Sequence, residues 1–176
     1  MEATITKNFK LEEPIEKVWA GLSNPMAISG CVPGASITEQ IDDNNYKGEV
    51  SLKFGPVKSK YDGQITIEKM DNANHTMVLK GKGLDSKGKG SADMTMNGGA
   101  KEVEGGTEVD FEMIVNIQGT LAQFGSRLIN DVSAQLMNQF VDNFKHMLAG
   151  EEFNNELKAG SMMGSVIKGF FKKGDS

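Results

Sequence analysis

Few side chains in this sequence have the types and spacing that catalysis or metal binding requires. His75 and His146 could act as general bases or metal ligands, and Cys31 could act as a nucleophile. His75 lies in an amide-rich segment that predicts a hairpin loop. His146 lies near the end of a predicted long helix, where a cation complements the helix dipole. No motif relates the three residues to one another, so we predict surface or capping histidines and a structural cysteine.

The remaining motifs are equally weak. A glycine-rich stretch from Gly83 to Gly90 resembles a phosphate-binding loop, but it lacks the Gly-Lys-Ser/Thr ending and precedes a strand-like pattern. The sequence contains no two-cysteine pair, no His-Glu-x-x-His motif and no EF-hand pattern. Glu108, Asp110 and Glu112 alternate with apolar residues, which is typical of a solvated sheet face. We therefore predict no catalytic residue and no covalent or metal cofactor.

The composition narrows the class of protein further. The formal charge of −5 over 176 residues argues against nucleic-acid binding. A single cysteine excludes an internal disulfide and suits a reducing compartment. We find neither a signal-peptide pattern nor an apolar run of about 18–20 residues. The expected setting is the cytoplasm, with peripheral contact at the inner face of the cell membrane as an option. The 11 methionines are flexible side chains that conform to irregular apolar shapes.

Periodicity predicts the elements that position these residues. A first strand ends at Leu11, a helix follows Pro14, and a second short helix covers about residues 25–30. Six more strands are predicted over 35–41, 46–54, 57–70, 76–82, around 92–96, and 107–118. Turns are predicted at 83–88, and glycine-containing segments at 97–99 and 104–106 bracket the link to the last strand. After Gly119, an apolar stripe at helical spacing over 121–148 predicts a long helix.

This order of elements predicts an α+β fold. We expect a seven-stranded curved antiparallel sheet around a long C-terminal helix, with two short helices between strands one and two. Residues 1–150 form the predicted folded domain. Residues 151–176 form a predicted flexible tether with an amphipathic tail.

The inward face of the predicted sheet is the most informative surface. Its side chains are mostly large and apolar, which fits either a filled core or a cavity for an apolar ligand. Tyr61 is the one hydroxyl-bearing aromatic there that could orient a polar head group. The predicted cavity-lining residues are Val50, Leu52, Tyr61, Ile65, Met77, Leu79, Met94, Met96, Phe111 and Met113 from the sheet, and Phe124, Leu128, Met137 and Val141 from the long helix.

The tail mixes phenylalanines and methionines with lysines over a short, glycine-interrupted stretch. Three interpretations stay open: a disordered end, an interfacial membrane helix, or a segment that docks into a partner's groove. The residues predicted to contact a membrane or partner are Met162, Met163, Val166, Ile167, Lys168, Phe170, Phe171, Lys172 and Lys173.

Several local motifs together resemble a known family. They are residues 9–19 with Pro14, Val18 and Trp19, Cys31-Val32-Pro33-Gly34, the 48–63 hairpin with Gly55-Pro56 and Tyr61-Asp62-Gly63, Gly83-Leu84-Asp85, Gly88-x-Gly90-x-Ala92, and Gly119-x-Leu121-Ala122-x-Phe124-Gly125-x-Arg127. Over about residues 3–148 this set resembles the carbon monoxide dehydrogenase CoxG family, which is part of the START-like helix-grip superfamily (SRPBCC).

The resemblance implies a helix-grip fold with an internal hydrophobic cavity. It also implies a non-catalytic partner of molybdenum-type carbon monoxide dehydrogenases or related hydroxylases, which recruits the enzyme to the membrane and carries quinone. We therefore expect a carrier of a quinone or lipid with peripheral membrane contact through its tail. An assembly or anchoring protein with a filled core and no internal ligand is the alternative, and a START-like small-molecule enzyme is a third hypothesis.

Overall fold

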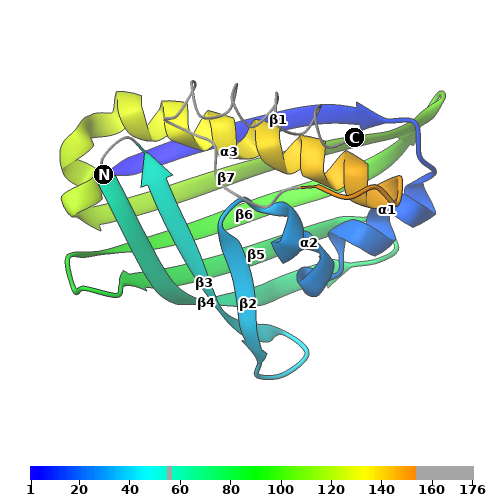
Figure 1. Ribbon diagram of the computed structural model, residues 1–176. Coiled ribbons are helices and arrows are strands. Elements are labelled where there is room, and N and C mark those ends of the chain that lie inside the picture. The colour runs from blue at the N-terminus through cyan, green and yellow to red at the C-terminus, as the bar shows by residue number, and fades with distance from the viewer. Residues whose placement is uncertain (55–56, 154–176) are drawn as a thin grey trace.

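The computed structural model describes residues 1–54 and 57–153 (Figure 1). The chain runs β1 (Glu2–Leu11), α1 (Ile15–Leu22), α2 (Pro25–Cys31), β2 (Ala35–Gln40), β3 (Asn45–Phe54), β4 (Val57–Asp71), β5 (Thr76–Asp85), β6 (Gly90–Val103), β7 (Gly106–Gly119), a 3₁₀ turn η1 (Thr120–Phe124) and α3 (Gly125–Leu148).

Within the described ranges the strands form one seven-stranded sheet in the order β1-β7-β6-β5-β4-β3-β2, and every neighbouring pair is antiparallel. The sheet curves, α3 runs along it beside β1 and β7, and α1 and α2 lie near the C-terminal end of α3 (Figure 1). The predicted fold class is confirmed: a curved antiparallel sheet, a long C-terminal helix and two short helices after the first strand. This architecture is the helix-grip fold.

Three boundaries differ from the sequence-based prediction. β5 continues to Asp85, so Gly83 is a strand residue opposite Gly63 and Ala92 rather than part of a turn. β6 likewise continues through Asn97-Gly98-Gly99, and the β6–β7 turn is limited to residues 104 and 105. The glycines suggested turns because glycine has a low propensity to form strands. Pairing on both sides overrides that propensity.

The long helix also begins later than its apolar stripe predicts. Gly119 and Gly125 have φ values of +97° and +84°, and the residues between them form the 3₁₀ turn η1. Both values lie in the left-handed region that glycine adopts without a steric penalty. The helical period therefore holds from Gly125 onward but not through Phe124.

The core consists of two apolar clusters along α3. The aromatic cluster includes Phe9, Trp19, Phe111, Phe140 and Phe144 and lies toward the α1 end. Its phenylalanine rings meet at centroid distances of 5.9–6.4 Å, Phe140 and Phe144 stacked and the other pairs edge to face. The aliphatic cluster lies toward η1 and includes Ile5, Tyr61, Ile117, Leu121 and Ile129. Met137 packs against both clusters and joins them.

Candidate functional site

The strand registers bring all ten predicted sheet residues onto one face. Val50 lies opposite Tyr61, Ile65 opposite Gly81, and Gly81 opposite Met94. Leu79 lies opposite Met96, which in turn lies opposite Met113. Leu52, Met77 and Phe111 share the same alternation. We call this surface the inner face, because it includes residues that pack with α3 in the two clusters. A role of these residues as ligand contacts stays a prediction.

Three of the four predicted helix residues face the sheet. Val141 is buried in the aromatic cluster, Leu128 packs against the aliphatic cluster, and Met137 contacts both. The spacing also predicts Phe124 among them, but its side chain is 40% exposed. It belongs to η1, where the chain follows a different helical period, so the spacing argument does not apply to it.

A group of inner-face side chains lies outside both clusters. Val50, Ile65 and Met94 are half-buried, and none of them packs against the buried core. They surround a row of glycines, Gly48, Gly63 and Gly83, which lie directly opposite one another on β3, β4 and β5. Because glycine has no side chain, the inner face is recessed along this row. The apolar side chains next to the row are partly exposed to solvent.

Two glycines of β5, Gly83 in the row and Gly81 beside it, lie under larger side chains of the inner face. A Cβ atom built on Gly83 would lie 3.5 Å from Cβ and 3.6 Å from Cδ2 of Tyr61. One built on Gly81 would lie 3.3 Å from Cγ and Cε of Met94. The sequence-based prediction missed this packing role of the glycines because it treated Gly83 as a turn residue. The detectable signal was glycine at alternate positions, 81 and 83, within an otherwise strand-like segment.

Tyr61 is one of the polar groups of this face, which also includes Asp85 and Tyr46, whose hydroxyl donates a hydrogen bond to the carbonyl oxygen of Asp43 at 3.2 Å. The side chain of Tyr61 is 7% exposed, and within residues 1–54 and 57–153 no hydrogen-bond partner is found for its hydroxyl. Burial raises the pKa of Tyr61, and the negative charge of Asp85, its direct partner on β5, raises the pKa further.

Asp85 is already engaged in the β5–β6 turn. One carboxylate oxygen accepts a hydrogen bond from the backbone N–H of Lys89 at 3.1 Å, and the other accepts a longer one from Lys87 at 3.3 Å. Asp85 therefore fixes the turn beside Tyr61. On this largely apolar face, the phenolic O–H of Tyr61 is therefore without a hydrogen-bond partner within residues 1–54 and 57–153.

Cys31, His75 and His146 are the three residues that could have taken part in catalysis or metal binding. Each lies in an environment typical of a structural residue. Cys31 is fully buried, its Sγ lies 3.6 Å from Sδ of Met147, and burial raises the pKa of its thiol to about 11. A thiol with this pKa is protonated and unreactive at neutral pH. The ring of His75 packs against Trp19 at 5.3 Å, and Nδ1 of His146 lies 3.3 Å from Oε1 of Glu151.

Other surface features lie away from the inner face. Within the described part of the chain, no group of three or more His, Cys, Asp and Glu side chains could hold a metal ion. A depression of about 550 Å³ on the opposite, outer face is lined by residues such as Asn8, Asn97 and Asp110. A second, of about 510 Å³, lies at the β5–β6 turn between Leu84 and Gly119.

Solved structures support the fold. A conserved protein from Geobacillus kaustophilus has a TM-score of 0.73 at 22% identity and covers 85% of this chain and 96% of its own. A protein from Rhizobium leguminosarum has a TM-score of 0.60 at 15% identity, covering 86% and 97%. An aromatase/cyclase from a Streptomyces species has a TM-score of 0.53 at 8% identity, covering 85% and 93%. At these identities the similarity shows the fold alone.

The family comparison is more specific than the structural one. A search of curated proteins gives no match. The family model of the carbon monoxide dehydrogenase protein CoxG matches residues 8–149, which include every strand except the start of β1, and all three α-helices. The chain belongs to the carbon monoxide dehydrogenase CoxG family.

Proposed function

We propose that this protein is a non-catalytic carrier of an apolar molecule with a polar head, a quinone or a lipid, for a carbon monoxide dehydrogenase-type enzyme. The observation that carries the proposal is the hydroxyl of the buried residue Tyr61, which lies on a largely apolar face and has no hydrogen-bond partner among the described residues. A quinone carbonyl or a lipid ester oxygen would accept its hydrogen bond, while half-buried residues such as Val50, Ile65 and Met94 would cover the apolar body. Each methylene buried in this way contributes about 0.8 kcal/mol.

The enzyme partner follows from the family name, and the family's status as an accessory component of the enzyme supports a non-catalytic role. The described helices include none that is long and apolar enough to cross a membrane. In this proposal, the predicted tail contributes to membrane contact. Its residues 160–176 lie outside the described part of the chain. Deleting residues 160–176 is expected to lower co-sedimentation with anionic liposomes, and unchanged co-sedimentation would refute the tail's role.

The carrier role is tested by native mass spectrometry and organic extraction of the purified full-length chain. We expect a co-purifying quinone or lipid, or, in the delipidated protein, saturable binding of a short-chain quinone. Met94→Trp is expected to reduce binding, because residue 94 lies on the inner face outside the packed clusters. Thr95→Trp is the matched control, because the next residue of β6 points to the outer face. A protein that is empty and binds no quinone or lipid would refute the proposal.

The second candidate is an anchoring protein without an internal ligand. The two packed clusters beneath α3 favour it, since much of the inner face is already covered by protein. For such a protein, both tryptophan variants would support enzyme recruitment equally, whereas a carrier would lose ligand delivery only with Met94→Trp. Enzyme pull-down and quinone-dependent turnover, measured on the same variants, separate the two candidates.

A further inference from the structure

Two lysines stand directly opposite each other at one end of the sheet. Lys53 on β3 and Lys58 on β4 are cross-strand partners on the outer face, and both are exposed. Like charges in this arrangement are destabilising. Among the described residues neither forms a salt bridge, whereas Lys60, two residues further along β4, pairs with Glu49 at 3.0 Å. Within the described part of the chain no carboxylate pairs with either lysine, so the charge of the two side chains is open to an external anion.

The same end of the molecule carries more positive charge and exposed apolar groups. The β5–β6 turn adds the exposed Lys87 and Lys89, and the carboxylate of this turn, Asp85, accepts hydrogen bonds from their backbone N–H groups. The exposed Asp62 lies opposite Leu84 on the neighbouring strand. Leu84 is 66% exposed and Phe124 is 40% exposed. β3, β5 and β7 end here, and β4 and β6 begin here, so the turns that join them lie at the same end of the strands (Figure 1). We call this end of the molecule the basic end and define it by Lys53, Lys58, Lys87, Lys89, Leu84 and Phe124.

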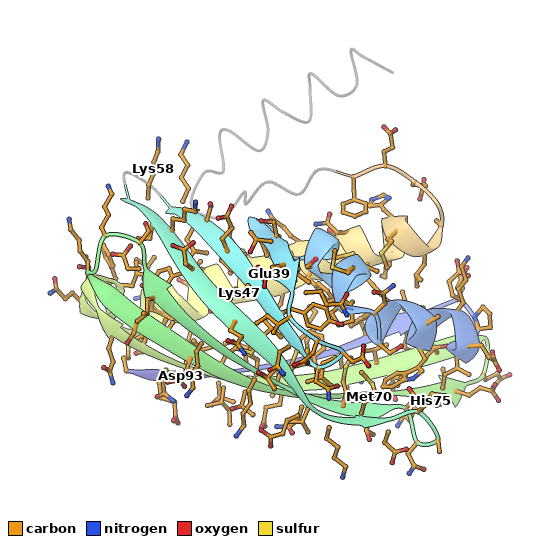
Figure 2. The ribbon with its side chains drawn as sticks, turned by 90° about the horizontal axis from the view of Figure 1, so that it is seen from below. Glu39, Lys47, Lys58, Met70, His75 and Asp93 are labelled. Carbon is orange, nitrogen blue, oxygen red and sulfur yellow. The ribbon has the colours of Figure 1, made fainter. Side chains whose placement is uncertain are left out.

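The opposite end of the molecule has the opposite charge. The β1–α1 connection and the β6–β7 turn carry Glu12, Glu13, Glu16, Glu102 and Glu104. Two lysines near them are paired, Lys17 with Glu13 at 3.0 Å and Lys101 with Glu108 at 2.9 Å, and a third, Lys10, lies opposite Glu108 on β1. Figure 2 shows the separation, with Lys58 at one end of the sheet and Met70 and His75 at the other. A chain with a net charge of −5 therefore presents one basic, apolar end.

We propose that the basic end docks the folded domain on an anionic phospholipid bilayer. Exposed lysines beside exposed apolar side chains suit a surface where phosphate groups border acyl chains. The acidic end is repelled by the same surface, so the charge separation orients the domain. This inference deepens the proposed carrier function, because Tyr61 lies three residues from Lys58, about 10 Å along β4. A ligand leaving the bilayer at this end would reach the phenol by a short path.

The first test compares full-length variants in vesicle co-sedimentation. The vesicles contain phosphatidylcholine with phosphatidylglycerol, or phosphatidylcholine alone. K53Q/K58Q is expected to weaken partitioning onto anionic vesicles about 30-fold, at about fivefold per lysine. The matched control is K47Q/K69Q, which removes two exposed lysines from the outer face of the same two strands, away from the turn. The control should bind as the native protein does, and the difference should shrink as salt is raised.

Two results would overturn the proposal. One is equal binding of anionic vesicles by K53Q/K58Q and by the native chain, which would leave any membrane contact to the tail. The other is retained vesicle binding with loss of affinity for purified carbon monoxide dehydrogenase, which would make the basic end a protein interface. The tail is intact in every variant, so its contribution cancels in the comparison.

A second test reports orientation directly. A polarity-sensitive thiol-reactive fluorophore is placed by Leu84→Cys at the basic end or by Ala73→Cys in the exposed β4–β5 loop at the other end. Cys31 does not interfere, because it is fully buried and its thiol pKa is about 11. A blue shift on anionic vesicles at position 84 but not at 73 supports the proposal. A shift at 73 alone would overturn it.

The proposed carrier function and the proposed docking surface can be refuted independently of each other. Quinone binding by K53Q/K58Q in vesicle-free solution should equal that of the native chain, because these side chains face away from the inner face. If no variant binds quinone or lipid, the carrier function is refuted while the vesicle comparison still tests the docking surface. If quinone binding is intact and the vesicle comparison shows no difference, only the docking surface is refuted.

Discussion

Tyr61 on β4 and Asp85 on β5 are direct cross-strand partners on the inner face, yet only Asp85 has hydrogen-bond partners in the described chain. The carboxylate accepts hydrogen bonds from the β5–β6 turn, whereas the hydroxyl of the buried residue Tyr61 has no partner among the described residues. Four predictions test this arrangement and the packing that supports it.

Tyr61→Phe is expected to leave the fold intact and to change the free energy of unfolding by less than about 1 kcal/mol, because the hydroxyl has no hydrogen-bond partner among the described residues. The same change should weaken quinone binding about tenfold, since one hydrogen bond is lost. Urea denaturation and quinone titration of delipidated protein measure the two effects. A loss of stability of about 1 kcal/mol or more would show that the hydroxyl is bonded within the folded chain.

Stability should fall at alkaline pH partly because of Cys31. The pKa of its thiol is raised by burial from 9.0 to about 11 in the folded state. Ionisation therefore favours the unfolded chain: the contribution is fully present below about pH 9 and is lost as pH rises toward about 11, for a total of about 2–3 kcal/mol. Urea denaturation at several pH values should show a shallower decline for Cys31→Ala over this window. Equal slopes in the two proteins would contradict the prediction.

Gly63→Ala should destabilise the sheet at the glycine row. A Cβ atom there would lie 2.2 Å from the carbonyl oxygen of Lys82 and 3.0 Å from Cα of Gly83, so the backbone of β5 must move. We expect a loss of about 1–3 kcal/mol. Gly30→Ala is the control, because nothing lies within 4 Å of its added Cβ and alanine favours the helix by up to about 1 kcal/mol. Thermal unfolding of both variants measures this difference in stability. Equal changes in the melting temperature of the two variants would contradict the prediction.

Asn143→Ala should loosen the contact between α3 and α2. The Asn143 side chain is buried, and its Nδ2 donates a hydrogen bond to the carbonyl oxygen of Cys31 at 3.0 Å. Removing it leaves that carbonyl without this donor, at a cost of about 1–3 kcal/mol. Asn130→Ala changes an exposed asparagine of the same helix and should stay within about 0.5 kcal/mol of the native protein. Similar effects in chemical denaturation would mean that the bond contributes little.

Periodicity in the sequence was sufficient for most of the fold. Strict alternation identified the side of each strand that meets the core, and it placed Val50, Tyr61, Met94 and Met113 on one face. Capping residues identified the short helices: Pro25 begins α2, and the Asn24 side chain accepts hydrogen bonds from the backbone N–H groups of Met26 and Ala27. Both signals are local, because they depend on the geometry of a single strand or helix.

The errors arose where distant segments determine a local conformation. Gly83 and residues 97–99 had the composition of turns, but strands on both sides hold them in the sheet. Phe124 had helical spacing, but the left-handed Gly119 and Gly125 on either side place it in a 3₁₀ turn and leave it 40% exposed.

The sequence by itself therefore determined the class of fold, the apolar character of most of the inner face and the place of Tyr61 on it. Tertiary structure alone decided that the Tyr61 hydroxyl has no partner in the described chain, that three glycines form a row beside it, and that Lys53 faces Lys58. Alternation identifies which side of a strand a residue faces. It does not identify the residue opposite, because the register between strands depends on pairing along the whole sheet.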